Sequence, residues 1–447
     1  MTAAVSERTR LWALAVCGLV LAAAVVGFNL LFLWMPDGWA PLHYGMATGV
    51  AAAYGRVVPL PSLTLTPVGV QRAGVTLLIA MWAAYALAMF IVATLRDGAG
   101  ARAAVRLVVV VGVIAGVALI VTPPVLSADL YHYAMFGRMV LTRGLNPYVT
   151  PPSALQGDPL LPLANWQDYT THYGPVFTGL SVLAAWLGAG GAIATALAFK
   201  TMATGFGALA AWAAARLAER EGRSALVPMA LIAWNPLALI ETAGSGHNEM
   251  IMMGLALAGL LTMARGRSSL GFVLLVASVH VKWVSAAVVG LVLIAHLHDI
   301  HGGRARARQL AKLVAIAVAL TVALYLPFWA GTDSMAAVKR LMLESRNAAG
   351  DKVMRPGNLL PFGAVVVLAI ALVTRYGRRF AFDMAAAVNL AFAVFVFNWI
   401  FPWYVLPALP LLAVGPLSRT NAALLLATSV CSVFLMKYWT LLVHFAA

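Results

Sequence analysis

Long apolar runs recur along the whole chain and are separated by short polar stretches, many of them rich in arginine. A helix that crosses the hydrocarbon core of a bilayer needs about 20 mostly apolar residues. The pattern predicts about 11 to 14 such helices, and the spread in this count comes from runs shorter than the spanning length. The clearest runs cover residues 11–33, 74–95, 105–121, 192–215, 225–240, 250–263, 313–327, 358–374, 382–397, 404–414 and 421–442. We therefore expect an all-α, polytopic membrane protein whose external loops carry short amphipathic helices.

The composition excludes the common soluble classes. Of the 447 residues 62% are hydrophobic and only 10% are charged, against about 45–50% and 25% in ordinary globular proteins. Lys and Arg total 30 against 15 Asp and Glu, an excess that fits cytoplasmic anchoring and anionic lipids better than nucleic acid. Cys17 and Cys431 each lie in an apolar run, which is typical of packing residues.

Arginine-rich loops predict the orientation, because positive flanks are retained on the cytoplasmic side. If the clusters at 96–106, 304–312 and 375–379 are cytoplasmic, three stretches lie on the extracytoplasmic side of the cell membrane. These are 34–72, 122–175 and 329–357. Two crossings between residues 175 and 216 would reverse everything that follows, so we expect 176–187 to lie in the interface or within one bent span.

The chain is expected to form a single integral membrane domain, 1–447. It comprises amino-terminal spans (1–121), an external catalytic loop (122–175) and the remaining spans (176–447) with a second external loop (329–357).

The densest polar segment follows Pro123 and Pro124, which end a span. Ser127 or Asp129 is expected to cap a new helix at the membrane surface. On that helix Asp129, His132 and Tyr133 share a face, because residues three to four positions apart are neighbours. An acid, an imidazole and a phenol would then point at one external cavity. In the alternative interpretation, Asp129 is only a helix cap and Arg138 is its distant ion partner.

A second group of polar residues precedes the next apolar run. Asp168 and His172 are four positions apart and could form a second acid and hydrogen-bonding pair. Tyr173, with Trp166 nearby, is a candidate for substrate binding, although aromatic residues beside a span also mark the interfacial belt.

A broken helix is predicted within residues 234–249. An Asn-Pro pair inside an apolar run, followed by two glycines before His247, indicates a break near the membrane edge, where freed backbone groups need water or a ligand. Glu241, Asn248 and Glu249 would gather there with His247. A structural role for a lone histidine is the alternative.

Several basic and aromatic residues further along are candidates for donor and sugar binding. Lys282 interrupts an apolar stretch, and it either snorkels to the interface or pairs with an anion in a polar cavity. Trp403 and Tyr404 would suit the wall of a sugar site or an interfacial belt. Five cations in 332–357 lie on the side from which the positive-inside rule should exclude them, so they suggest phosphate binding or an amphipathic helix on anionic lipid. The residues assigned to the donor phosphate are Arg340, Arg346, Lys352 and Arg355.

These motifs, in this order, resemble those of the GT-C superfamily of polyprenyl-phosphate-sugar-dependent glycosyltransferases. The nearest resemblance is to glycosyltransferase family 87 and the bacterial polyprenol-phosphate-mannose alpha-mannosyltransferases. The motifs are Ser127-Ala-Asp-Leu-Tyr-His-Tyr, Gly137-Arg138, Gly144-Leu-Asn-Pro-Tyr148, Tyr173-Gly-Pro175, Gly246-His-Asn-Glu249, Lys282 and Phe401-Pro-Trp-Tyr404. The resemblance implies that Asp129 is the general base. The sequence departs from the family in placing Asp129 after its third predicted span instead of the first, and in having Glu249 where Asp is expected.

The chemistry of such a transfer needs few groups. A base takes the proton of the acceptor hydroxyl, whereas a phosphate leaves as a stable anion without an acid. One carboxylate and a cation cluster therefore suffice for inversion at the anomeric carbon, with no metal or other cofactor.

The expected partners are a polyprenyl-phosphate sugar (mannose by resemblance), a glycan or lipid-linked acceptor and membrane lipids, with the protein acting as a monomer. The alternatives are a secondary transporter or lipid flippase, in which the same acids and cations couple protons and anions, and a non-catalytic assembly protein.

Overall fold

The computed structural model describes residues 6–31, 66–95, 98–124, 127, 129–339, 359–396, 401–415 and 418–435. Every regular element within these ranges is helical, and several helices are long and apolar enough to cross a membrane. The prediction of an all-α, polytopic membrane protein is confirmed. A bilayer core offers no water to backbone groups, so helices that satisfy their own hydrogen bonds are the expected solution for apolar runs of this length.

Seven helices in the described ranges meet the length and hydropathy of a span, or eight if a bent pair is counted as one. They are α1 (Glu7–Leu31), α3 (Pro67–Thr94), α4 (Ala99–Val121), α7 (Ala192–Arg220), α13 (Gly303–Tyr325), α15 (Leu359–Tyr376) and α16 (Arg378–Ala391), the last continued by a π-helical turn (Phe392–Val396). The bent pair is α8 (Leu226–Ala233) with α9 (Pro236–Ala238) and the π-helix η4 (Leu239–Gly244).

The sequence predicts more spans than this because its count includes several shorter apolar runs. In the structure these runs form helices of 10–17 residues, which are below the spanning length. These include α6 (Pro175–Gly188), α10 (Glu249–Ala264), α11 (Ser268–Val279), α12 (Ala286–His298) with the turn η5 (Trp283–Ser285), and α17 (Ala408–Val414) with the turn η10 (Pro402–Val405). The other elements are α5 (Asp129–Arg143), α14 (Thr332–Lys339), α18 (Arg419–Leu435) and the turns η2 (Pro152–Ala154), η3 (Leu161–Leu163) and η6 (Leu326–Phe328).

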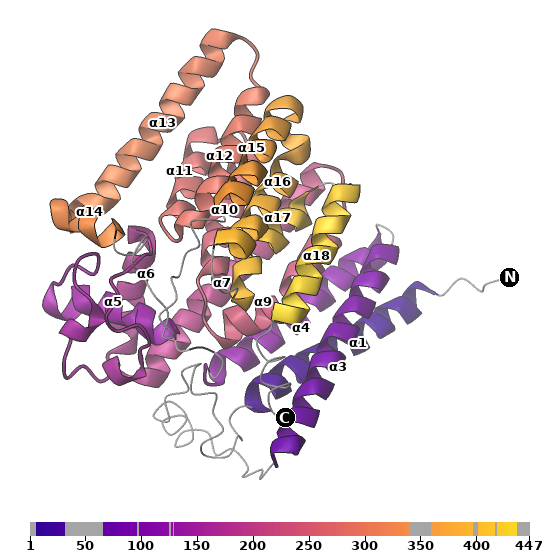
Figure 1. Ribbon diagram of the computed structural model, residues 1–447. Helices are drawn as coiled ribbons and strands as arrows, with labels where there is room; N and C mark the ends of the chain where they lie inside the picture. The colour runs from indigo at the N-terminus through magenta and orange to yellow at the C-terminus, as the bar shows by residue number, and fades with distance from the viewer. Residues whose placement is uncertain are drawn as a thin grey trace.

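The helices form a bundle with two flanking groups (Figure 1). On one side α1 packs against α3 and α4, and in the centre α10 packs against α7 and α11. The helix α13 runs along the opposite edge and has a single buried residue, Leu313. At one end of the bundle, α5 and α6 pack on each other.

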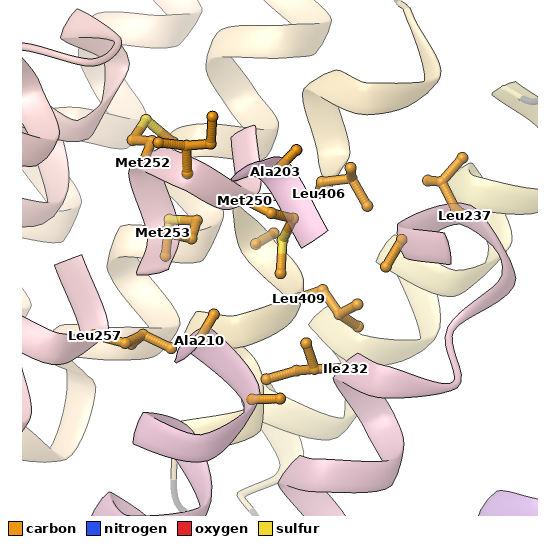
Figure 2. Close-up of a cluster of buried hydrophobic side chains, with 14 of the residues drawn as sticks. Ala203, Ala210, Ile232, Leu237, Met250, Met252, Met253, Leu257, Leu406 and Leu409 are labelled. Atoms are coloured by element: carbon orange, nitrogen blue, oxygen red, sulfur yellow. The ribbon is translucent and has the colours of Figure 1, made fainter. Parts of the chain in front are cut away.

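Small residues on α7 allow α10 to approach closely. Figure 2 shows Met250 of α10 near Ala203 of α7, and Leu257 of α10 near Ala210 of α7. A Cβ at Gly254 of α10 would lie 2.5 Å from a backbone oxygen of α7. Apolar side chains do not drive helices together in lipid, so such close packing is a main source of helix association there. The contact fixes the start of α10, where the predicted polar break ends.

The segment between 175 and 216 contains one helix of spanning length. The 14-residue α6 packs on α5, whereas α7 runs for 29 residues. At the end of α7, the Arg220 guanidinium donates to the carbonyl of Ala264, 2.7 Å away, and just after it Arg223 donates to the carbonyl of Gly415. The arginine pattern calls for an odd number of crossings in this segment, and α7 is the one helix here that is long enough to cross.

The arginine-rich turns and the polar motifs lie at opposite ends of the bundle. The turn between α15 and α16 contacts the end of α12, where Arg378 forms an ion pair with Asp299 at 2.9 Å. At the other end of α13, the Asn146 amide donates to the carbonyl of Phe328, beside α5 and its loop (Figure 1). The motifs singled out in the sequence therefore gather away from the turns rich in arginine.

Candidate active site

The helix α5 begins at Asp129, shortly after the two prolines that follow α4. The Ser127 hydroxyl accepts a hydrogen bond from the Asp129 backbone N–H at 3.2 Å, so Ser127 acts as the cap, and Asp129 is in the first turn of α5. A serine before the first turn satisfies a backbone donor that the helix leaves unpaired. In this position the Asp129 side chain is 19% exposed.

The predicted helix break is present. The Asn235 side chain accepts from the Ala238 N–H and Pro236 begins a new helical turn, which continues as the π-helix η4. The two halves are bent by 52°. Gly246 has φ +75, a conformation that glycine adopts without strain. π-Helical segments are frequent at functional sites, and this one brings Glu241 and His247 to the same place.

His247 lies between two carboxylates. Its Nδ1 is 3.9 Å from Asp129 Oδ2, and its Nε2 is 3.4 Å from Glu241 Oε2. The Tyr133 hydroxyl is 3.3 Å from Nδ1, and the Trp403 ring stacks on the imidazole with centroids 3.8 Å apart. His247 and Glu241 are both 1% exposed, in contrast to Asp129. Asp129 is therefore the most accessible member of this acid–imidazole–acid group.

A buried ion pair lies beside this group. The Lys282 ammonium donates to a Glu249 carboxylate oxygen and lies 5.8 Å from the Tyr173 ring centre and 5.3 Å from that of Tyr404. Burial, and then the negative charges of Asp129 and Glu249, raise the pKa of Tyr173 well above its usual value. Tyr173 also packs edge-on against Tyr133, with ring centres 5.2 Å apart, and so links the two groups.

Nine of the residues selected from the sequence are thus brought together from five segments of the chain. They are Asp129, Tyr133, Tyr173, Glu241, His247, Glu249, Lys282, Trp403 and Tyr404. Asn248 lies between two of them and is fully buried, and neither atom of its amide has a hydrogen-bond partner within the described part of the chain.

Other selected residues lie elsewhere. Arg138 lies in the second half of α5 and forms an ion pair with Asp158 at 2.6 Å, so the interpretation that made it the ion partner of Asp129 is wrong. Asp168 is exposed, and among the described contacts no hydrogen bond joins it to His172. His172 instead packs against Tyr173, with ring centres 4.1 Å apart, and His132 packs on Phe136.

Arg340, Arg346, Lys352 and Arg355 lie outside the described residues. Lys282 is therefore the cation that the described structure brings to the group. No set of three or more His, Cys, Asp or Glu in the described ranges is arranged to hold a metal ion. Our sequence interpretation overlooked Lys200, which lies in the middle of α7 and is fully buried. A lysine inside a spanning run is itself the signal that could have identified it.

The pH dependence of stability tests the burial of His132. Burial lowers the pKa of this histidine to about 4, against the opposing effect of a hydrogen bond with the Asn165 backbone. In the unfolded chain its pKa is about 6.5. As the pH falls from 6.5 to 4, the unfolded chain binds a proton that the folded protein does not, so stability falls. We expect His132→Gln to reduce this decline when Tm is measured against pH. Parallel curves of Tm against pH for the wild type and the variant would contradict this expectation.

Gly174 allows two backbone segments to meet behind Tyr173 and Lys282. A Cβ at Gly174 would lie 2.3 Å from the backbone oxygen of His280, and the Gly174 N–H donates to the Val281 carbonyl. We therefore expect Gly174→Ala to lower Tm by several degrees and to reduce activity, because backbone atoms cannot yield as a flexible side chain can. Gly179→Ala is the matched control, since a Cβ there has no atom within 4 Å. Equal Tm values for the two variants would show that the contact is not needed.

Comparisons with known proteins identify a family model and relatives that are similar to this chain. A family model described as the N-terminal domain of alpha-(1->6)-mannopyranosyltransferase matches residues 38–298, more than half of the chain. The chain is 28% identical over 187 residues to alpha-(1->6)-mannopyranosyltransferase A of Corynebacterium glutamicum. It is 30% identical over 208 residues to the protein of the same name from Mycobacterium tuberculosis. These alignments cover 42% and 46% of the chain but only 38% and 40% of the two relatives.

Proposed function

The chain belongs to the alpha-(1->6)-mannopyranosyltransferase family, and from this membership we propose that it transfers a mannosyl group from polyprenyl-phosphate mannose to a mannose-containing glycan or lipid-linked acceptor. A (1->6) linkage requires the hydroxyl on carbon 6 of the acceptor sugar as the nucleophile. The observation that carries the proposal is the partly exposed carboxylate of Asp129 beside the buried His247–Glu241 pair. All three residues lie within the part of the chain that matches the family model.

Asp129 acts as the general base in this proposal. Its carboxylate takes the proton of the acceptor hydroxyl while the hydroxyl oxygen forms a bond to carbon 1 of the mannosyl group. The bond between carbon 1 and the phosphate oxygen breaks, and its electron pair leaves with the polyprenyl phosphate. Attack opposite the leaving group inverts the configuration at carbon 1. A positioned base contributes about 10²–10⁴-fold to such a reaction.

The neighbouring residues orient the base and bind the leaving group. His247, which lies 3.4 Å from Glu241 on one side and stacks on Trp403, shapes the surroundings of Asp129. Lys282, whose side chain keeps 11% of its surface exposed, supplies positive charge for the developing phosphate, together with Arg340, Arg346, Lys352 and Arg355. Fixed charges aimed at the position where charge develops stabilise a transition state without reorganisation.

An extracytoplasmic site is part of the proposal. It is supported by the separation between the group around His247 and the turns that carry Arg265, Arg304 and Arg378, because such turns are retained in the cytoplasm. A polyprenyl-phosphate sugar presents its head group at the membrane surface, which is where a group at the end of a helical bundle would meet it.

Transfer by purified protein tests the function. The protein is reconstituted in liposomes with polyprenyl-phosphate mannose and a mannan oligosaccharide, and the product is analysed for new linkages. The proposal predicts an oligosaccharide longer by one α-(1->6)-linked mannose. Uptake of the oligosaccharide or the lipid across the bilayer with no new glycosidic bond would support a transporter or flippase instead.

A further inference from the structure

Lys200 is a fully buried lysine within a membrane span, and its partners are backbone carbonyls. Its ammonium donates to the carbonyl oxygens of Leu119 and Thr122, at the end of α4. No ion pair joins it to an acid among the described residues. Burying an ammonium without a carboxylate is costly, although the negative end of a helix dipole offsets part of the cost. Ionisable groups within spans are retained mostly where they serve a function.

The carbonyls that Lys200 binds belong to the turn that leads to Asp129. The side-chain amide of Asn29, from α1, donates to the Thr122 hydroxyl at 2.6 Å and to the Pro123 carbonyl at 3.4 Å. The end of α4 is thus held by side chains from two other spans. The chain continues from there through the Ser127 cap into the first turn of α5.

The aliphatic stem of the same lysine lies beside the other half of the site. A Cβ at Gly246 would lie 3.3 Å from Lys200 Cγ and 3.4 Å from Leu130 Cδ2. Gly246 directly precedes His247, and Leu130 directly follows Asp129. Lys200 therefore contacts both segments, with its ammonium on the turn before α5 and its stem beside the glycine at the helix break.

We propose that Lys200 is a positioning residue that sets the separation of Asp129 and His247, an inference that rests on the proposed function of Asp129. The ammonium holds the turn that carries the base, and the stem supports the segment that carries the imidazole. Loss of the ammonium would release the end of α4 from α7 and shift Asp129. A misplacement of about 1 Å can cost on the order of 10²-fold in rate.

Kinetics of Lys200→Met test this role, because methionine keeps an unbranched apolar stem and removes the ammonium. We expect kcat per folded molecule to fall about 10- to 100-fold, with KM for donor and acceptor changed less than about two-fold. Thr204→Val is the control on the same helix, since the Thr204 hydroxyl is buried without a partner, and it should keep the wild-type kcat. Lys200→Gln, which retains an N–H donor, should lie between wild type and Lys200→Met.

A double-mutant cycle distinguishes positioning from a purely structural role. If Lys200 acts through Asp129, its substitution should have little further effect on kcat in the Asp129→Asn background. The effects of substituting two residues that act together are not additive. Should Lys200→Met not fold, Lys200→Gln takes its place in the cycle. A lowered Tm with unchanged kcat, or fully additive effects, would overturn the positioning role. Wild-type protein that makes no product would overturn the proposed function itself and this role with it.

Discussion

Replacing Asp129 by asparagine is expected to lower kcat for mannosyl transfer by about 10²–10⁴-fold, the usual contribution of a general base. The amide has nearly the shape of the carboxylate but cannot accept the proton of the acceptor hydroxyl. KM for the donor should change little, because the donor phosphate is assigned to Lys282 and the other cations. Initial rates at saturating donor and acceptor, with folded protein quantified, measure the effect.

Asp168→Asn is the matched control for this substitution. Asp168 belongs to the same polar loop but is exposed, so its variant should keep the wild-type rate within about two-fold. If Asp129→Asn protein also kept the wild-type rate, Asp129 would not be the general base.

Replacing Lys282 by methionine is expected to lower the free energy of unfolding by about 3–5 kcal/mol, the usual cost of removing one partner of a buried ion pair. The substitution leaves the carboxylate of Glu249, which is 2% exposed, without its cation. It also removes the ammonium from the faces of Tyr173 and Tyr404. Denaturant unfolding in detergent micelles measures the loss.

The double variant Lys282→Met/Glu249→Gln is the control for that interpretation. A neutral amide needs less compensation than a carboxylate, so the double variant should be more stable than Lys282→Met alone. If the effects of the two substitutions on stability were additive, the double variant would be less stable than either single variant. The stability lost in Lys282→Met would then not come from an unpaired carboxylate.

The fold class could be predicted because a bilayer restricts what an apolar run can become. Runs such as 192–215 have few alternatives to a helix, and the structure has α7 there. The number of spans could not be predicted as well, since a run such as 271–279 has the composition of a span without the length. Whether such a run crosses depends on its packing partners, which the pattern does not contain.

Local features of the site were predictable, and its assembly was not. Asn235-Pro236 and Gly246 indicate a break by their backbone requirements alone. That the break would bring His247 within 3.9 Å of Asp129 depends on the packing of α5 and α7. Arg138 shows the reverse error. It is on the same helix as Asp129, but in the second half of α5, where Asp158 pairs with it.

The consumption of polyprenyl-phosphate mannose by Asp129→Ala protein, with and without sodium azide, tests the central claim most directly. Azide attacks carbon 1 without losing a proton, and so it needs no base. We predict almost no donor consumption without azide, and formation of a mannosyl azide of inverted configuration when azide is present. Transfer of mannose to the acceptor hydroxyl by this variant at the wild-type rate, without azide, would contradict the assignment of Asp129 as the base.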